Sequence, residues 1–185
     1  MRVISGERRG KKLYTLEGTN TRPTLDRVKE ALFNIIQNKI LDANVLDLFA
    51  GSGSLGIETL SRGARHVVFC DHSFEAIKVI KKNIEETKYI EKSTIINKDY
   101  KLALKQISKT DGKFDIVFLD PPYKSDFGIK AIDELIKLDL IAEDGIIILE
   151  TDDENRKKEI EENKQIKIFD ERKYGSVKLI FIRKE

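Results

Sequence analysis

The sequence predicts an α/β protein in which helices cover both faces of a mostly parallel sheet. Short apolar runs alternate with segments of helical periodicity from Ala43 onward, a pattern typical of βαβ units. A glycine-rich turn follows the first apolar run, at the kind of strand end where open sheets bind ligands. The last two runs are joined around Tyr174-Gly175 without a helix between them, so they should pair as an antiparallel hairpin.

The composition fits one domain, residues 1–185, because 40% hydrophobic residues in a chain of 185 can enclose a sizeable core. The same hydrophobic content excludes a disordered or fibrous chain. The 34 Lys and Arg residues nearly balance the 32 Asp and Glu residues. No apolar stretch approaches the roughly 18 residues of a membrane span. A single cysteine, Cys70, and two histidines argue against a disulfide scaffold and a zinc site. We therefore expect a cytoplasmic monomer that contacts no membrane and holds no metal.

Residues 1–20 are expected to form a basic hairpin or extended arm around the turn from Gly6 to Gly10. The first twelve residues carry five basic side chains against one acidic one, so the basic excess of the chain lies at its front. Such a cluster can bind phosphate groups, although short basic N-termini are also commonly only solvated. Residues 21–38 follow as an amphipathic helix, because apolar positions recur at spacings of three and four and Pro23 suits a first helical turn.

The remaining elements alternate along the chain. Strands are expected over Val45 to Phe49, His66 to Cys70, Thr94 to Asn97, Phe114 to Leu119, Ile146 to Glu150, Ile166 to Phe169 and Val177 to Ile182. Helices are expected over Leu55 to Arg62, Phe74 to Glu86, Tyr100 to Ile107, Ile129 to Leu138 and Asp153 to Glu162. Because ligands bind beyond the carboxyl ends of the strands in such a sheet, candidate functional residues lie where the strands stop.

The first strand leads through a glycine-rich turn into a helix. Gly51 and Gly53 would let the backbone approach a ligand closely, and the helix start offers free amide groups. With Gly56 they also satisfy the G-x-G-x-x-G pattern of nicotinamide dinucleotide sites. Asp47 changes this interpretation, because a carboxylate there would repel a pyrophosphate but suits the ammonium group of an amino-acid-bearing cofactor. The alternative is a carboxylate that caps its own loop.

The second and third strands end in residues that suit a nucleoside. Asp71 is placed to accept hydrogen bonds from both hydroxyls of a ribose, a feature shared by sites for NAD and for S-adenosylmethionine. His72 could lie against an adenine, although a surface histidine is the simpler interpretation. Asp99 and Tyr100 could hold adenine through its amine and its face, but an isolated Asp-Tyr more often marks the N-cap of the next helix.

The fourth strand ends in the most specific motif, Asp120-Pro121-Pro122-Tyr123. Two consecutive prolines stiffen the loop and remove amide donors, so the Asp120 carboxylate and the Pro121 carbonyl remain as acceptors facing one point. Such a pair suits an NH2 group on a planar base. Tyr123 can stack on that base, at a typical gain of about 1 to 3 kcal/mol. The alternative is a purely structural turn.

These motifs resemble those of class I S-adenosylmethionine-dependent amino-methyltransferases. More narrowly, the chain resembles the RsmD family of bacterial 16S rRNA guanine-N2 methyltransferases, and this resemblance covers essentially its whole length. The matching segments are Met1 to Gly6, Arg9 to Leu13, Thr21 to Thr24, Asp26 to Val28, Ala31 to Asn34, Asp47 to Gly56, Leu60 to Ala64 and Tyr174-Gly175. One departure is Asp71, where many relatives carry Glu, a change that should leave ribose binding intact.

The resemblance implies a Rossmann-like class I methyltransferase fold with a seven-stranded, mostly parallel sheet. It also implies methylation of the exocyclic N2 amine of a guanine in small-subunit rRNA, either free or within the assembling small ribosomal subunit. Residues expected to bind the cofactor S-adenosyl-L-methionine are Asp47, Phe49, Gly51, Gly53, Asp71, His72, Asp99 and Tyr100. The expected catalytic residues are Asp120, Pro121, Pro122 and Tyr123. Residues expected to bind RNA are Arg2, Arg8, Arg9, Lys11, Lys12, Arg22 and Arg27.

Three other functions fit parts of the sequence. A DNA adenine-N6 methyltransferase can carry the same four-residue signature, but this chain has no room for a separate DNA-recognition domain. A nicotinamide-dependent oxidoreductase would explain the three glycines and Asp71, yet it gives no use for the residues from Asp120 to Tyr123. A non-catalytic RNA-binding module would not need a complete cofactor pocket. For Arg22 and Arg27, the alternative to RNA contact is holding the N-terminal helix against the cofactor loop.

Overall fold

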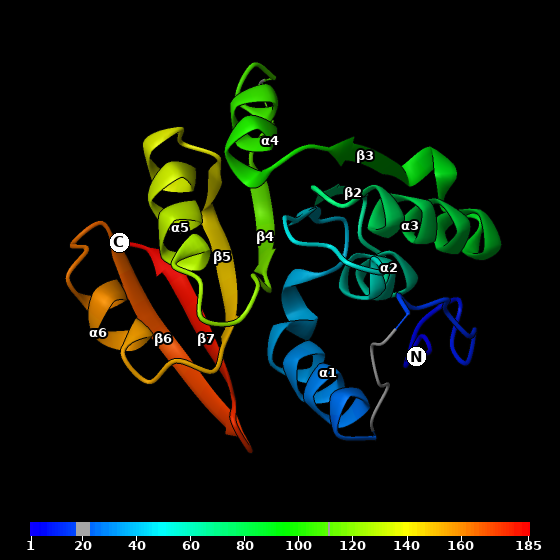
Figure 1. Cartoon of the computed structure of the whole chain (residues 1–185), viewed down its shortest axis with the longest axis horizontal. Coiled ribbons are helices and arrows are strands. Elements are labelled where there is room, and N and C mark those ends of the chain that lie inside the picture. Colours follow the sequence, from blue (N-terminus) through cyan, green and yellow to red (C-terminus); the bar gives the residue numbers. More distant parts are fainter. Residues whose placement is uncertain (18–22, 111) are drawn as a thin grey trace.

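The central sheet contains seven strands in this computed structural model, which describes residues 1–17, 23–110 and 112–185. They are β1 (Asn44–Asp47), β2 (His66–Asp71), β3 (Ser93–Asn97), β4 (Phe114–Leu119), β5 (Ile141–Thr151), β6 (Ile166–Tyr174) and β7 (Val177–Lys184). Their order across the sheet is β3-β2-β1-β4-β5-β7-β6 (Figure 1). Strands β1 to β5 run parallel, whereas β7 is antiparallel to both of its neighbours. The expected C-terminal hairpin is confirmed.

Helices cover both faces of the sheet and form two hydrophobic cores. They are α1 (Pro23–Ile36), α2 (Ser54–Ser61), α3 (Phe74–Thr87), α4 (Tyr100–Ile107), α5 (Phe127–Lys137) and α6 (Arg156–Glu161). Apolar side chains of α1, α2 and α3 pack with Phe118 and Phe181 on one face, and those of α4, α5 and α6 pack with Val117 and Ile180 on the other. In the part of the chain that the structure describes, no helix is both long and apolar enough to cross a membrane.

Most expected boundaries agree with the structure to within one or two residues, but the start of β5, the start of α6 and the end of β6 differ. Strand β6 ends at Tyr174 rather than Phe169, because its pairing with β7 continues past a register shift between Ile168 and Asp170. Strand β5 begins at Ile141 rather than Ile146, because Ile141 pairs with Phe114 before a register shift in β4. Helix α6 begins at Arg156 rather than Asp153. The Thr151 hydroxyl oxygen accepts a hydrogen bond from the Asp153 amide, and the Asp153 carboxylate accepts one from the Asn155 amide. These two bonds hold the segment before α6 in a turn.

The N-terminal segment folds back on itself and packs against α2. Arg2 pairs with Lys12 in an antiparallel bridge, and the Val3 amide donates to the Lys11 carbonyl at 2.9 Å. The Val3 side chain is buried in the core beneath α1 and α2. Gly6 has a φ of +84°, and a Cβ atom on it would lie 1.9 Å from the Ser61 carbonyl oxygen. Only glycine therefore allows this close approach.

The sheet brings the carboxyl ends of β2, β1, β4 and β5 together at one edge. Four acidic residues occupy these ends: Asp71, Asp47, Asp120 and Glu150. Asp47 lies level with Phe69 of β2 and Phe118 of β4 in the parallel register. The fold thus brings together, from the ends of four strands, acidic residues that lie up to 103 positions apart in the sequence.

Candidate active site

The glycine-rich loop between β1 and α2 places free backbone beside the strand ends. Gly51 and Gly53 have φ values of +55° and +78°, and Gly53 is the N-cap of α2. Nothing lies within 4 Å of the position where Gly51 would carry a Cβ atom, so its backbone borders open space. Gly56 has a different role, because a Cβ on it would lie 2.3 Å from the Phe69 ring. This third glycine allows α2 to pack on β2.

Asp71 holds the glycine-rich loop against the end of β2. Its Oδ2 accepts a hydrogen bond from the Gly51 amide at 2.9 Å, and its Oδ1 accepts one from the Ser73 amide at 2.9 Å. Each carboxylate oxygen has a further lone pair for a ligand hydroxyl. The neighbouring His72 side chain is 73% exposed, and its Nδ1 lies 3.6 Å from Asp71 Oδ1. The predicted ribose-binding residue therefore also shapes the loop.

Asp47 lies buried beneath the same loop. Its Oδ2 accepts a hydrogen bond from the Gly56 amide at 3.1 Å. Burial raises the pKa of this carboxyl group to about 7, the Gly56 hydrogen bond opposes the rise, and the charges of Asp120 and Asp71 add to it. A cation bound above these strand ends would favour the ionised form of Asp47.

Asp99 caps α4, as the alternative interpretation of the sequence expected. Its Oδ1 accepts hydrogen bonds from the Lys101 amide at 3.0 Å and from the Leu102 amide at 3.2 Å, which leaves Oδ2 for a ligand.

The Tyr100 ring packs against other aromatic rings and is largely inaccessible to a ligand. It lies between Phe49 and Phe127, with ring centroids 5.6 and 5.4 Å away, and only 8% of the residue is exposed. Its hydroxyl is buried with no hydrogen-bond partner in the described part of the chain. The expected contact between the Tyr100 face and an adenine stays a prediction, and the neighbouring Phe49 and Phe127 rings leave little of the Tyr100 ring accessible for it. Phe49 and Phe127 are the more accessible rings of this cluster.

The Asp120-Pro121-Pro122-Tyr123 loop leaves the sheet directly after β4. Beyond it, Ser125 fixes the chain by donating its Oγ hydrogen to the Pro122 carbonyl at 2.6 Å. The Pro121 carbonyl accepts no hydrogen bond within the described residues, so it remains available to a ligand. The Tyr123 ring is 60% exposed beside it. The loop therefore presents the acceptors and the ring that the motif predicts.

The Asp120 carboxyl group faces a second acid, Glu150 of β5, which the sequence interpretation missed. Asp120 is open to solvent, yet desolvation by the surrounding protein raises the pKa of its carboxyl group to about 6. Burial and the Asp120 charge raise the pKa of Glu150 to about 8. A sequence signal was present, since Glu150 ends a predicted strand. Its partner became known only with the strand order.

Two further buried residues that the sequence interpretation missed tie the glycine-rich loop to the N-terminal segment. The Asn83 side chain of α3 donates to the Ser52 and Tyr14 carbonyls at 2.9 Å each and accepts from the Tyr14 amide at 2.8 Å. The Lys29 ammonium group of α1 donates to Ser54 Oγ at 2.9 Å and lies 3.1 Å from Glu58. The glycine-rich loop and the N-terminal segment are therefore one packed unit.

The basic residues expected to bind RNA fall into two groups. Arg2, Arg8 and Lys11 make internal contacts, with Asp26 at 3.6 Å, the Thr87 carbonyl at 2.9 Å and Glu86 at 2.8 Å. Arg9, Lys12 and Arg27 are exposed and have no ion pair or hydrogen bond among the described side chains. Arg9 and Arg27 line one hollow between the N-terminal segment and α1. The prediction for Arg22 lies outside the described residues.

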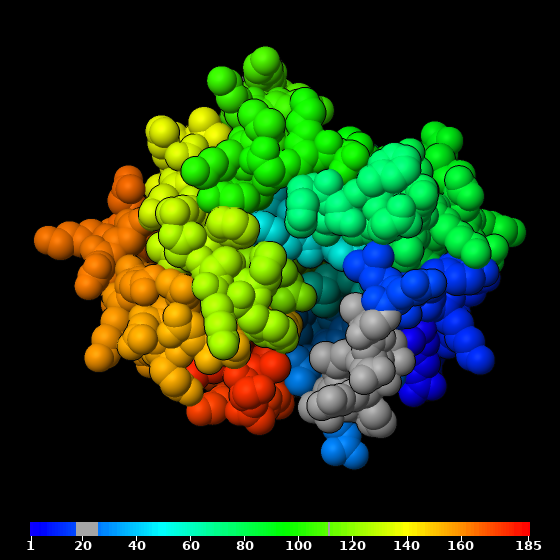
Figure 2. Space-filling view, in the orientation of Figure 1, coloured from blue at the N-terminus to red at the C-terminus, as the bar shows by residue number. Residues whose placement is uncertain are grey.

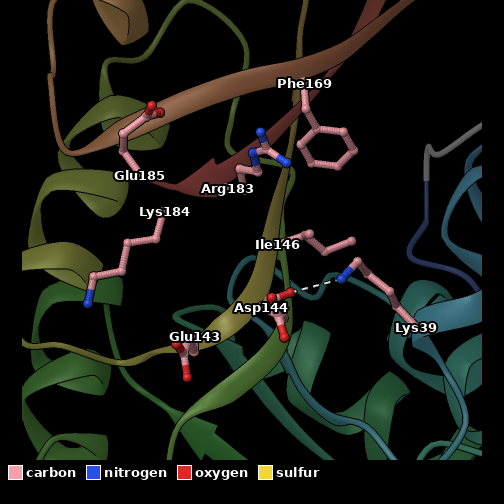
Figure 3. Close-up of a pocket in the computed structure, with 8 residues that line it drawn as sticks. All are labelled: Lys39, Glu143, Asp144, Ile146, Phe169, Arg183, Lys184 and Glu185. Carbon is pink, nitrogen blue, oxygen red and sulfur yellow. Dashed lines mark hydrogen bonds between the residues drawn. The ribbon is translucent and has the colours of Figure 1, made fainter.

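The shape of the surface distinguishes this region from a second cavity. Figure 2 shows a hollow between the yellow-green segment after β4 and the blue N-terminal segment, with cyan and teal atoms of the β1–α2 region at its bottom. A cavity of about 500 Å³ lies at the opposite edge of the sheet, beside the amino end of β5 (Figure 3). There the Lys39 ammonium group donates to the Asp144 carbonyl at 2.9 Å, and none of the motif residues takes part.

The strand order, the antiparallel β6–β7 pair and the motif-bearing strand ends define a class I methyltransferase. A family model described as Conserved hypothetical protein 95 matches residues 1–183. The chain belongs to this family, the RsmD family of methyltransferases.

Named relatives agree with this membership. YlbH of Bacillus subtilis, which carries the name of an rRNA methyltransferase, is 44% identical over 83% of this chain and 84% of its own length. Ribosomal RNA small subunit methyltransferase D of Haemophilus influenzae is 40% identical over 82% of this chain and 79% of its own length. The solved structure of the methyltransferase YhhF from Escherichia coli superimposes with a TM-score of 0.85 at 30% identity, over 100% of this chain and 98% of that one.

These comparisons confirm the predicted fold class and the methyltransferase class. A more distant neighbour at 18% identity, with a TM-score of 0.65 over 81% of this chain and 48% of its own, was solved with S-adenosylhomocysteine and shares the fold. Membership of a methyltransferase family argues against the alternative of a nicotinamide-dependent oxidoreductase.

Proposed function

We propose that this chain is a single-domain, monomeric, cytoplasmic enzyme that methylates the N2 amine of a guanine in small-subunit 16S rRNA. The observation that carries the proposal is the Asp120 to Tyr123 loop. It presents an open carboxylate, an unoccupied carbonyl acceptor and an exposed ring beside the glycine-rich loop. Two relatives carry the name of small-subunit rRNA methyltransferase D, which favours rRNA over DNA as the substrate.

The cofactor would lie across the strand ends. Asp71 has free lone pairs for the ribose, Asp99 retains one oxygen for the adenine amine, and Gly51 and Gly53 leave room for close backbone contact. Phe49 and the exposed His72 border this region. S-adenosylmethionine supplies a methyl group on a positively charged sulfonium, so it also suits the acidic edge of the sheet.

The protein residues would orient the amine and accept its proton. Asp120 and the Pro121 carbonyl accept the two N2 hydrogens, which favours the pyramidal form and frees the nitrogen lone pair. Tyr123 stacks on the base once it is turned out of the RNA, and Pro122 holds the loop rigid. The N–C bond forms as the S–C bond breaks, and the surplus N2 proton passes to the Asp120 carboxylate. Positioning supplies most of the acceleration.

The deciding experiment compares small-subunit RNA from cells with and without this protein by mass spectrometry of nucleosides. We expect loss of one N2-methylguanine in the small-subunit RNA of the deletion strain, restored by the intact gene. Purified enzyme should then transfer labelled methyl groups to free 16S rRNA or to assembling subunits from that strain, which shows which form is the substrate. Label in adenine of DNA instead would support the rival amino-methyltransferase.

Cofactor affinity should rise with pH, from about pH 5.5 to about pH 7.5, by roughly tenfold. Burial raises the pKa of Asp47 to about 7 and that of Asp120 to about 6, so both carboxyl groups are largely protonated at the acidic end. The cofactor carries two cations, an ammonium group that suits Asp47 and a sulfonium near Asp120, and both favour the ionised carboxylates, so its binding releases protons. Titration calorimetry in two buffers of different ionisation enthalpy measures this release. S-adenosylhomocysteine keeps the ammonium group but lacks the sulfonium charge, so it should show a weaker dependence, and an equal dependence would contradict the placement of the sulfonium near Asp120.

The free protein should show the opposite pH trend in stability. A carboxyl group whose pKa is higher in the folded state than its usual value of about 4 binds protons preferentially when folded. The contribution of Asp47 to the free energy of unfolding is therefore lost as the pH rises through the window between about 4 and about 7. Chemical denaturation across this window should show that the free energy of unfolding falls more steeply with rising pH for the wild type than for D47N.

Removing exposed positive charge from the N-terminal hairpin should weaken RNA binding without changing cofactor binding. The double substitution R9A/K12A is preferable to deletion of residues 1–12, because the hairpin backbone packs against α2. If each side chain contacts a phosphate, the slope of log affinity against log salt should fall by about 2, as measured by filter binding. The matched control K105A/K109A removes two exposed charges from α4 and its end. Equal losses in both variants would indicate a nonspecific effect.

A further inference from the structure

Glu150 is the immediate neighbour of Asp120 across the sheet. In the parallel register of β4 and β5, Phe118 pairs with Ile148 and Leu119 with Leu149, so the next residues in line are Asp120 and Glu150. Phe118 and Ile148 belong to one hydrophobic core, and the next residues of the two strands, Leu119 and Leu149, belong to the other. Because side chains alternate along strands, both acids project toward the same face of the sheet.

Glu150 has no internal partner that explains it. It makes no hydrogen bond and no ion pair with the side chains that the structure describes, although it is partly buried. It lines a small hollow together with Pro121, Pro122 and Tyr123. Burial and the Asp120 charge both raise its pKa, which means that the fold pays in stability for this carboxylate. A ligand that brings hydrogen-bond donors to this point would compensate the carboxylate.

Guanine offers the donors that two adjacent acids require. Its Watson–Crick edge carries the N2 amine and, on the next ring atom, the N1–H donor. Adenine differs at the matching place, because the ring nitrogen beside its exocyclic amine is an acceptor, which an ionised carboxylate repels. When Asp120 and the Pro121 carbonyl hold N2, the N1–H group is the next donor along the edge, and Glu150 is the next acceptor along the sheet.

We propose that Glu150 accepts a hydrogen bond from N1–H of the target guanine and so selects guanine over bases that lack this donor. This inference rests on the proposed function and adds the determinant of base specificity to it. Glu150 would act as a specificity residue, while Asp120 and Pro121 act on the reacting amine. The ionised carboxylate of Glu150 is the stronger acceptor, and the N1–H donor stabilises that form.

The test uses the intact enzyme and two synthetic RNAs that carry either guanine or 2-aminopurine at the methylated position. 2-Aminopurine keeps the N2 amine but has an acceptor in place of N1–H. For the wild type we expect kcat/KM to favour guanine. In E150Q the amide can turn to donate to the ring nitrogen, so the guanine preference should fall by at least about tenfold, in line with the worth of one base-edge hydrogen bond. The matched control E143Q changes an exposed acid at the opposite end of β5 and should keep the wild-type preference.

Each outcome decides a separate point. If the wild type methylates neither RNA nor any other guanine substrate, the proposed function fails. If the wild type methylates guanine and E150Q keeps the full guanine preference, the role of Glu150 is overturned. E150Q should fold at least as well as the wild type, because it removes repulsion from Asp120, and its S-adenosylhomocysteine affinity reports an intact cofactor site. E150A, which can neither accept nor donate, should lower activity on both RNAs and also reduce the preference.

Discussion

D120A is expected to lower kcat for methyl transfer by about 10² to 10⁴-fold while the protein remains folded and binds S-adenosylhomocysteine. Asp120 directly follows β4, at the edge of the sheet where the glycine-rich loop lies, and in the proposed function its carboxylate is the acceptor for the reacting amine. Its loss removes both the acceptor that orients the amine and the base that takes the proton. The change should appear in single-turnover rates rather than in KM, because Tyr123 still stacks on the base.

The conservative variant separates chemistry from folding. In D120N the amide oxygen can still accept one hydrogen bond from the amine, but it cannot take the proton, so activity should recover only in part. D144A, on an exposed acid at the opposite edge of the sheet, is the matched control and should keep wild-type rates. Full methyl transfer by a folded D120A enzyme would remove Asp120 from the mechanism.

The sequence allowed prediction of the site residues that belong to a recognisable local motif. Asp120 is recognisable because Pro121, Pro122 and Tyr123 follow it, and Asp71 because it ends an apolar run twenty residues after Gly51. Both lie at the predicted strand ends in the structure. The role of Glu150 required the pairing of β4 with β5, since strand order is not contained in a local pattern.

Buried polar residues were harder to predict, because their partners come from distant segments. Asn83 occupies a buried position of α3 between Ile80 and Ile84, where the apolar period alone gives no reason for an amide. Its partners Tyr14 and Ser52 are 69 and 31 residues away. The signal that could have identified Asn83 is a polar residue on the apolar face of a predicted helix, because a buried amide there needs backbone groups as hydrogen-bond partners.

The basic N-terminus shows the opposite difficulty. Its charge predicts contact with phosphates, and Arg9 and Lys12 are exposed as that prediction requires. The backbone of the same segment also packs against Glu58, an acidic residue that no local sequence pattern predicts to be buried. The Ile4 amide donates to Glu58 Oε2 at 2.8 Å and the Ser5 amide donates to Oε1 at 3.0 Å. Charge patterning alone cannot separate these two roles.

E58A is expected to lower the free energy of unfolding by about 3 to 5 kcal/mol, the usual cost of breaking a buried ion pair. Glu58 is fully buried in α2 and compensates Lys29 at 3.1 Å and Arg62 at 2.8 Å, in addition to the two N-terminal amides. Burial lowers the pKa of Lys29 and Glu58 opposes that shift, so the variant leaves a buried ammonium group without its counter-charge. Urea denaturation of wild type and variant measures the difference.

A second variant distinguishes charge compensation from simple packing. Replacing both partners, as in K29M/E58L, removes the uncompensated ammonium group, so this double variant should be more stable than E58A. The exposed pair of Lys78 and Glu75 serves as the control, and E75A should change the free energy of unfolding by less than about 0.5 kcal/mol. Because Lys29 also donates to Ser54 at the start of α2, E58A should weaken S-adenosylhomocysteine binding as well. If E58A unfolds like the wild type, or if the double variant is no better than E58A, the network does not hold the N-terminal hairpin and the cofactor loop together through charge.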